Sequence, residues 1–210
     1  MRSLLLTCGL LLFMMGCQKS NEPPKPPSSQ PQEAATTAIG VLQKMVTEKN
    51  FRALGFDSAD QVKQAQLGEP LAIYDVGLDQ LKTYKTGTDP NTLLVQSSRT
   101  LYPVTVDGQV KSSVTISHKE SGYQASSFGN AEIIKSLSRY RQAQTASGDF
   151  VVRIPAFNMY YLARRVEKRL VLVPIIDDPR LKLKPGEAVS AETVLDQLVP
   201  LANAYNGLPM

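Results

Sequence analysis

The chain has 210 residues, with 23 basic and 19 acidic side chains and a formal net charge of +4 at pH 7. This mild balance argues against a nucleic-acid-binding protein, which needs a concentrated positive field along the phosphates. Only two cysteines and one histidine occur, so neither a disulfide scaffold nor a cysteine-rich zinc site is expected.

The N-terminus combines a basic residue with a short apolar run. Arg2 precedes the run from Leu4 to Met15, which ends at Gly16 and Cys17. A helix of about twelve residues covers about 18 Å, too little for a hydrocarbon layer of about 30 Å. An ordinary secretory cleavage site needs small residues at positions −1 and −3. Gly16 meets the first condition, but Met14 does not meet the second.

This segment resembles the signal peptide of bacterial lipoproteins, with residues 1–16 removed and Cys17 as the first mature residue. The resemblance implies that the Cys17 thiol accepts a diacylglyceryl group and that the freed amine is also acylated, with chains such as palmitate. Met14 and Met15 stand where the family usually has Leu followed by Ala or Ser, so a conventional or uncleaved signal remains the alternative. Gln18 after the cysteine favours the outer membrane, facing the periplasm, over the inner one.

Residues 17–32 form the lipidated cysteine and a proline-rich tether, with prolines at positions 23, 24, 26, 27 and 31. Such a composition favours extended polyproline II, which reaches roughly 45 Å at about 3.1 Å per residue. Residues 33–210 are then expected to form a single globular domain.

Hydrophobic periodicity in residues 33–210 predicts an α+β fold, with antiparallel sheet meanders packed by an N-terminal, a middle and a C-terminal helix. Ser58 and Gln61 form a capping-box pattern that opens a short helix. Ser190 is expected to cap the last helix, with Val189 and Val194 as a hydrophobic staple, and Pro200 to kink or split it. The predicted helices cover residues 33–50, 58–66, a segment after Asn130 and a segment after Ser190; the strands cover 70–76, 92–96, 102–106, 110–119, 122–128, 150–154, 158–164 and 170–176.

A hairpin is expected around Asp107 and Gly108. On its second strand, valines and an isoleucine alternate with lysines, serines and a threonine, which predicts one dry and one wet face. A three-residue loop with a left-handed Gly108 would place Val104 opposite Val110 and keep the valines on one face.

Few residues suggest catalysis. His118, the only histidine, lies on the apolar side of a strand, where a partly buried structural imidazole is expected. Asp177 and Asp178 form a tight acidic pair, but neighbouring strand residues point to opposite faces, so a strand-ending turn is the simpler interpretation. No nucleophile elbow, metal-binding helix motif or phosphate loop occurs, and no cofactor or metal is expected.

Four basic residues gather at a predicted hairpin tip: Arg164, Arg165, Lys168 and Arg169. All four are expected to reach solvent. They form either a charged turn that resists edge aggregation or a patch for an anionic partner near the membrane.

These observations favour a membrane-anchored, non-enzymatic envelope lipoprotein that binds a protein or an envelope polymer. An envelope hydrolase that uses Asp177 or Asp178 is one alternative. The order of a long helix followed by antiparallel strands resembles cystatin-like and propeptide-type modules, which implies a peptidase inhibitor as another. The oligomeric state is left open.

Overall fold

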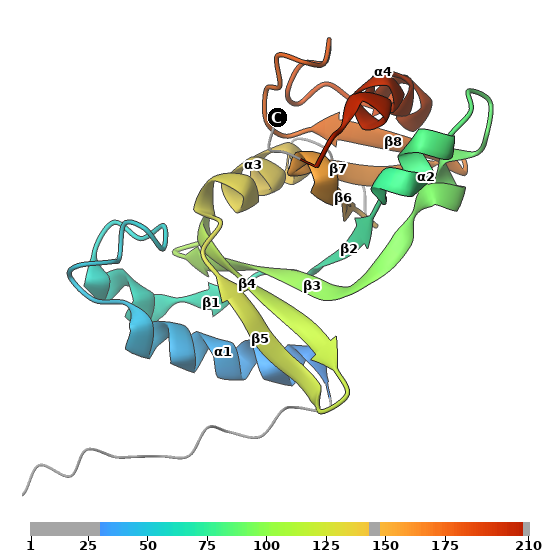
Figure 1. Ribbon diagram of the computed structural model, residues 1–210. Coiled ribbons are helices and arrows are strands. Elements are labelled where there is room, and N and C mark those ends of the chain that lie inside the picture. Colours follow the sequence, from blue (N-terminus) through green and yellow to red (C-terminus); the bar gives the residue numbers. More distant parts are fainter. Residues whose placement is uncertain (1–29, 143–147, 208–210) are drawn as a thin grey trace, which may run out of the picture.

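The computed structural model describes residues 30–142 and 148–207. The predicted signal peptide, Cys17 and all but the last three residues of the predicted tether therefore lie outside the described residues. The predicted α+β class is confirmed, because several helices pack on one mixed sheet whose strands are mostly antiparallel (Figure 1).

Most elements follow one another with short connections, but longer segments separate α1 from η1 and β8 from β9. The α-helices are α1 (Pro31–Met45), α2 (Leu78–Thr83), α3 (Ala131–Gln142) and α4 (Ala191–Ala204). The 3₁₀ helices are η1 (Ala59–Gln64), η2 (Pro90–Leu93) and η3 (Pro155–Phe157). The strands are β1 (Gln66–Leu67), β2 (Leu71–Asp75), β3 (Val95–Val106), β4 (Gln109–Lys119), β5 (Gly122–Phe128), β6 (Phe150–Ile154), β7 (Met159–Val166), β8 (Arg169–Pro174) and β9 (Val189–Ser190).

The sheet has the strand order β5-β4-β3-β2-β6-β7-β8-β9, and the short β1 pairs with β3 beside β2. Strands β2 and β6 are parallel, while their other neighbours are antiparallel. The two predicted antiparallel meanders are present, and a parallel pair of strands joins them, with Ile73 opposite Val151.

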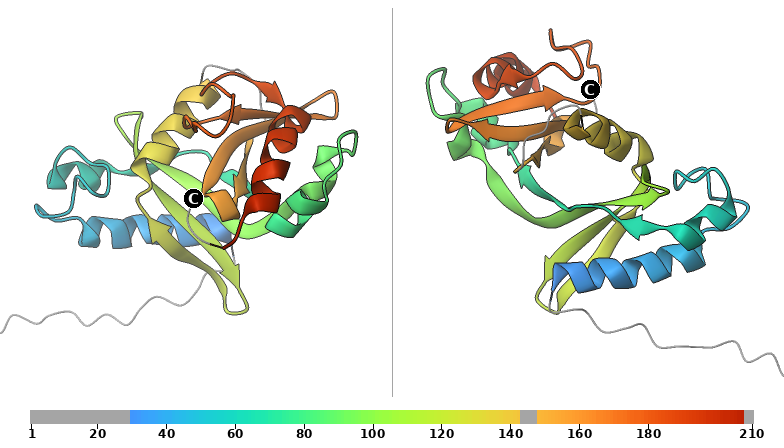
Figure 2. Two further views of the ribbon diagram at one scale, coloured as in Figure 1. Left: turned by 45° about the horizontal axis from the view of Figure 1, so that its top comes forward. Right: turned by 180° about the vertical axis from the view of Figure 1, so that it is seen from behind.

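Helices cover both faces of this sheet. On β6, Phe150 and Val152 pack into a core with α2 and α4, whereas Val151 packs into a core with α3. On β3, Tyr102 packs under α1, whereas Leu101 packs under α3. Figures 1 and 2 show α1 along the half of the sheet that holds β4 and β5, and α4 along the half that holds β7 and β8.

Helix α1 begins with Pro31 in its first turn, where a proline suits a helix. Its buried stripe consists of Ala34, Ala35, Ala38 and Leu42. The helix ends at Met45, earlier than the predicted Asn50, because Asn50 folds back: its side-chain amide donates to the Met45 carbonyl. Small alanines let α1 lie close to β4 and β5.

The hairpin between β3 and β4 differs from the prediction. Val106 pairs with Gln109 across a two-residue turn in which Asp107 (φ 51°) and Gly108 (φ 72°) are both left-handed. Two positive φ angles fit the primed hairpin turns, so the predicted three-residue loop is wrong. A bulge after Val104 instead returns valines of the two strands to the same face of the sheet. It sets Val104 opposite Ser112.

The remaining local predictions concern helix α4 and the segments that precede β3. The Ser190 hydroxyl accepts from the Thr193 amide, as predicted for the cap of α4. Pro200 does not split that helix, which runs on to Ala204. At η1, Gln61 bonds to Asp57 rather than to Ser58, so the predicted capping box is wrong. Between residues 90 and 96 a 3₁₀ helix precedes β3 where one strand was predicted.

Candidate functional site: a hydroxyl-lined cleft under helix α3

A cleft of about 240 Å³ opens on the face of the sheet that α3 covers. Its floor comes from six neighbouring strands and its wall from the start of α3. The lining residues are Ile73, Arg99, Leu101, Ser113, Thr115, Ser117, Ser126, Ser127, Asn130, Ile133, Ile134, Val151, Arg153 and Tyr160. We call this the α3 cleft. It brings together residues from β2, β3, β4, β5, β6 and β7, which lie up to 87 positions apart in the sequence.

Hydroxyl groups form one side of the α3 cleft. The Ser113 hydroxyl donates to the Gly129 carbonyl at 2.6 Å, which ties β4 to the turn before α3. Ser117 donates to Ser126 at 2.7 Å, and Ser126 donates to the Thr115 carbonyl. Each hydroxyl has two acceptor lone pairs and one donor, so this network keeps its geometry and still has accepting capacity toward the cleft.

These hydroxyls lie on the strand face that the sequence assigned to solvent. Ser113, Thr115 and Ser117 are buried, with exposed fractions of 1%, 7% and 7%. The prediction of a wet face on this strand is therefore wrong, because α3 covers it. Buried polar side chains beside an open cleft point to a functional site more strongly than exposed polar side chains do.

Two arginines form the opposite side. Arg153 Nε lies 2.8 Å from Asp75 Oδ1, and Arg153 Nη2 lies 3.2 Å from Asp75 Oδ2. Arg99 Nη2 lies 3.4 Å from Asp75 Oδ2, and Arg99 Nε donates to the Ser97 hydroxyl. Burial alone would lower the pKa of Arg153, but its hydrogen bonds to Asp75 and Tyr160 and the charge of Asp75 outweigh this effect and raise it. The Arg153 guanidinium therefore remains charged.

The charge of the lining is positive. Arg99 and Arg153 both line the cleft, and among the described residues no carboxylate does, since Asp75 lies behind the two arginines. The first turn of α3 contributes Ile133 and Ile134, and the amide end of a helix adds a partial positive charge. The α3 cleft is thus suited to a ligand with negative charge and hydrogen-bonding groups.

The predicted basic patch is only partly exposed. Arg164 is buried, with 8% of its surface exposed, because its side chain turns inward and pairs with Asp149 at 3.4 Å. The prediction that four basic residues share the surface is therefore wrong for Arg164. Its neighbour Arg165 is exposed but rests on the Phe150 ring, at 4.8 Å from the centroid, and donates to Asn91. Lys168 and Arg169 are exposed at the turn.

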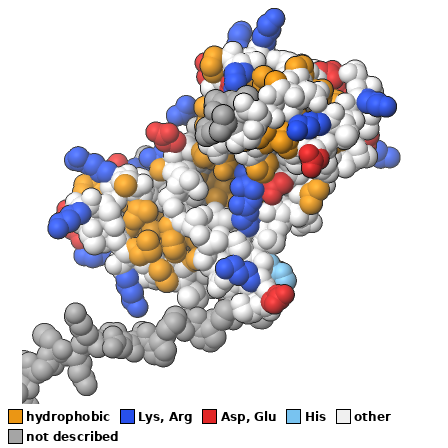
Figure 3. Space-filling model, in the orientation of Figure 1, with side chains coloured by type: hydrophobic (Ala, Val, Ile, Leu, Met, Phe, Trp, Pro, Cys, Tyr) orange, Lys and Arg blue, Asp and Glu red, His pale blue; other side chains and the backbone are white. Residues whose placement is uncertain are grey.

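Basic side chains are scattered on the face drawn in Figure 3 and do not gather into one broad surface there. The three remaining members of the predicted patch stand beside Glu167 at the hairpin tip. The tip therefore offers less positive charge than the sequence indicated.

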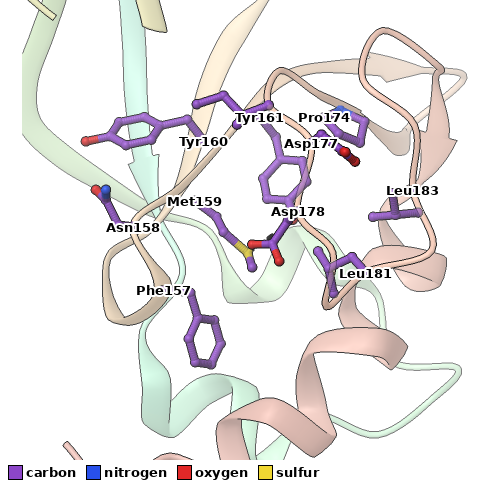
Figure 4. A pocket seen from close by; sticks show the side chains of 11 residues that line it. Phe157, Asn158, Met159, Tyr160, Tyr161, Pro174, Asp177, Asp178, Leu181 and Leu183 are labelled. Atoms are coloured by element: carbon purple, nitrogen blue, oxygen red, sulfur yellow. Dashed lines mark hydrogen bonds between the residues drawn. The ribbon is translucent and has the colours of Figure 1, made fainter. Parts of the chain in front are cut away.

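Asp177 and Asp178 line a smaller hollow of about 70 Å³ with Phe157, Met159 and Tyr161. Figure 4 shows the two carboxylates pointing in different directions. Asp178 is bound by Arg180, whose Nη2 lies 2.6 Å and whose backbone amide lies 3.0 Å from its oxygens. The side-chain hydrogen bond from Arg180 lowers the pKa of Asp178. A turn with a carboxylate bonded to a nearby amide is what the sequence predicted.

His118 is exposed and lies against the Tyr123 ring, at 4.5 Å between centroids. The predicted partial burial is wrong, because His118 is exposed at the next-to-last position of β4. Among residues 30–142 and 148–207, no group of three or more histidine, cysteine or acidic side chains is placed to hold a metal ion. In the same residues, no helix has the length and apolar character needed to cross a membrane.

Sequence reasoning missed the α3 cleft. A signal existed, since the supposed wet face of β4 has serines and a threonine at its centre and lysines only at its ends. Small hydroxyl side chains tolerate burial when they find hydrogen-bond partners, whereas lysine side chains are almost never buried.

No family model, curated protein or solved structure matches this chain.

Proposed function

We propose that this chain is a lipid-anchored protein of the bacterial cell envelope, held by Cys17 in the outer membrane and facing the periplasm. Its α+β domain acts as a non-enzymatic binding module, and the α3 cleft is its binding site. The single observation that carries the binding function is the cleft itself, which combines two arginines with a network of hydroxyls that runs from the buried Ser117 to the exposed Ser126.

The anchoring proposal rests on the N-terminal sequence. The apolar run from Leu4 to Met15 followed by Gly16 and Cys17 is typical of lipoprotein signals. One acyl chain binds a membrane only marginally, whereas two or more hold a protein stably. A proline-rich segment after the cysteine would hold the domain away from the bilayer and leave the cleft accessible.

Binding is supported more strongly than hydrolysis. Hydrolysis by paired carboxylates needs one group that can hold a proton at working pH. Asp178 does not meet this requirement, because the side-chain hydrogen bond from Arg180 stabilises its charged form and lowers its pKa. Asp75, behind the lining of the α3 cleft, forms ion pairs with Arg99 and Arg153.

Anchoring is tested by mass spectrometry and membrane fractionation of the full chain and of Cys17→Ser. The wild-type protein is expected to lose residues 1–16, to gain the mass of a diacylglyceryl group with an N-acyl chain, and to sediment with outer membranes. Cys17→Ser is expected to remain unmodified. A wild-type protein with an unmodified Cys17 would overturn the anchoring proposal.

The cleft is tested by capture of envelope components on the full-length protein. Ser127→Phe places a ring at the exposed rim of the cleft, and Ser121→Phe makes the same change on the exposed β4–β5 turn. Capture is expected to fall at least tenfold for Ser127→Phe and to stay unchanged for Ser121→Phe. Equal capture by both variants would show that binding does not use the cleft.

A further inference from the structure

We infer that the α3 cleft binds a sugar unit that carries a carboxylate, such as a uronic acid of an envelope polysaccharide. This inference rests on the proposed function, because it names the ligand class of the same site. Three features of the cleft support it, namely the charge of the lining, the type of its polar groups and its size.

The charge fits a monoanion. Arg99 and Arg153 contribute two positive charges, and the single carboxylate of Asp75 behind them offsets one. The cluster therefore has a net charge of +1. A carboxylate neutralises it, whereas a phosphate monoester, at about −1.5 to −2 near pH 7, leaves excess negative charge close to Asp75. The planar fork of a guanidinium also matches the two oxygens of a carboxylate.

The remaining lining fits sugar hydroxyls. Ser117, Ser126 and Ser127 present hydroxyls from two adjacent strands, and Asn130 adds an amide at the start of α3. Hydroxyl and amide groups both donate and accept, as the hydroxyls of a sugar do. The Ser117–Ser126 bond holds two of these groups in fixed positions, so little side-chain entropy is lost when a ligand binds.

Apolar groups complete the site. Tyr160 and Ile133 line the cleft beside the arginines, and they offer a surface for the C–H face of a sugar ring. Most drug-sized ligands occupy sites of about 300–1,000 Å³. The α3 cleft, at about 240 Å³, suits one monosaccharide unit rather than an extended oligomer.

The test is calorimetric titration of the full-length protein in detergent micelles with four probes. Glucuronate is the expected ligand, and glucose is its neutral counterpart with the same ring. Acetyl-alanyl-alanine supplies a carboxylate without a sugar, and inorganic phosphate supplies a different anion. Glucuronate is expected to bind with a Kd at least tenfold lower than that of each of the other three probes.

Variants locate the binding. Arg99→Met is expected to raise the Kd for glucuronate at least tenfold, and Ser127→Phe is expected to do the same without removing a charge. Ser121→Phe is the control and is expected to bind like the wild type. Ser127→Phe keeps the test valid if Arg99→Met fails to fold.

Several outcomes would overturn the inference. Equal binding of glucose and glucuronate would remove the role of the carboxylate, and tighter binding of the peptide or of phosphate would name a different ligand. No binding of glucuronate, together with Ser127-dependent capture of envelope components, would refute the sugar acid and leave the proposed function standing. If that capture is also independent of Ser127, both proposals fail.

Discussion

Arg164 on β7 and Asp149 just before β6 form an ion pair in the interior, with Arg164 Nη2 3.4 Å from Asp149 Oδ1. The Asp149 side chain is fully buried, and that of Arg164 is 10% exposed. Burial raises the pKa of Asp149, although the charges of Arg164 and Arg141 act against this change. An arginine that the sequence places at an exposed tip thus serves to compensate a buried carboxyl group.

Replacing Arg164 is therefore expected to destabilise the protein. Arg164→Met leaves the Asp149 carboxylate buried without its partner, and breaking a buried pair in this way costs about 3–5 kcal/mol. Denaturant unfolding of Arg164→Met measures this loss. The control Arg169→Met, at an exposed position of the same hairpin, is expected to change stability by less than about 0.5 kcal/mol. Equal stabilities of the two variants would contradict the buried pair.

Asp178 is expected to make stability depend on pH. Arg180 lowers the pKa of Asp178 in the folded protein below its ordinary value of 3.8. The unfolded chain then binds the proton more readily, so Asp178 contributes stability above about pH 4 that is lost as the pH falls through the folded pKa. Unfolding experiments from pH 7 to pH 2 are expected to show a smaller acid loss for Asp178→Asn than for the wild type.

The matched control for this pH series is Asp177→Asn, which changes the exposed neighbour and leaves the contacts between Asp178 and Arg180 in place. Its acid loss is expected to follow that of the wild type. An acid loss of Asp178→Asn that equals the wild-type loss would contradict a stabilising role for the Arg180 pair.

Pro200→Ala is expected to stabilise the protein. Pro200 is exposed inside α4 and has no amide to donate to the preceding turn. A proline in a helix interior costs about 3 kcal/mol relative to alanine. Proline also restricts the unfolded chain, which offsets about 1 kcal/mol of that cost. A gain of about 1–2 kcal/mol in the free energy of unfolding is therefore expected from thermal or denaturant unfolding.

Pro155→Ala provides the comparison, because Pro155 begins η3, where a proline has a suitable φ angle. It is expected to lower stability slightly. A loss of stability for Pro200→Ala would mean that this proline makes favourable contacts that outweigh its missing hydrogen bond.

Asp75→Asn is expected to destabilise the joint between the two meanders. Asp75 is on β2, and its carboxylate binds Arg99 on β3 and Arg153 on β6. Loss of this charge leaves two half-buried guanidinium groups close together, at a cost of about 1–3 kcal/mol. Denaturant unfolding measures the cost against Asp107→Asn, an exposed turn position whose left-handed conformation suits asparagine. Equal stability of both variants would contradict this role of Asp75.

Local patterns in the sequence predicted much of the fold. The alternation of Val114 and Ile116 with polar residues placed a strand correctly, and the Ser190 cap placed the start of α4. These features depend on residues close together in the chain. The parallel pairing of Ile73 with Val151 does not, and no local pattern announces which strands from distant segments become neighbours.

The candidate site was beyond sequence reasoning for the same reason. Burial of Ser113 and Ser117 depends on α3 folding back over β4, and the pairing of Asp75 with Arg153 joins residues 78 positions apart. The position of Arg164 in a basic run indicated an exposed side chain. Strand alternation instead turns this side chain toward Asp149. A run of basic residues in the sequence indicates an exposed patch, but only the fold determines which of their side chains reach the surface.

The proposed function requires that ligands enter the α3 cleft and not the basic hairpin tip. Methyl NMR of the full-length protein in detergent, titrated with solubilised envelope polysaccharide, distinguishes the two sites. The methyl signals of Ile73, Ile133 and Val151, which line the cleft, are expected to shift, while the signal of Val166 beside the tip, 48% exposed, stays in place. A shift of Val166 with unchanged cleft signals would contradict the account and assign binding to Arg165, Lys168 and Arg169.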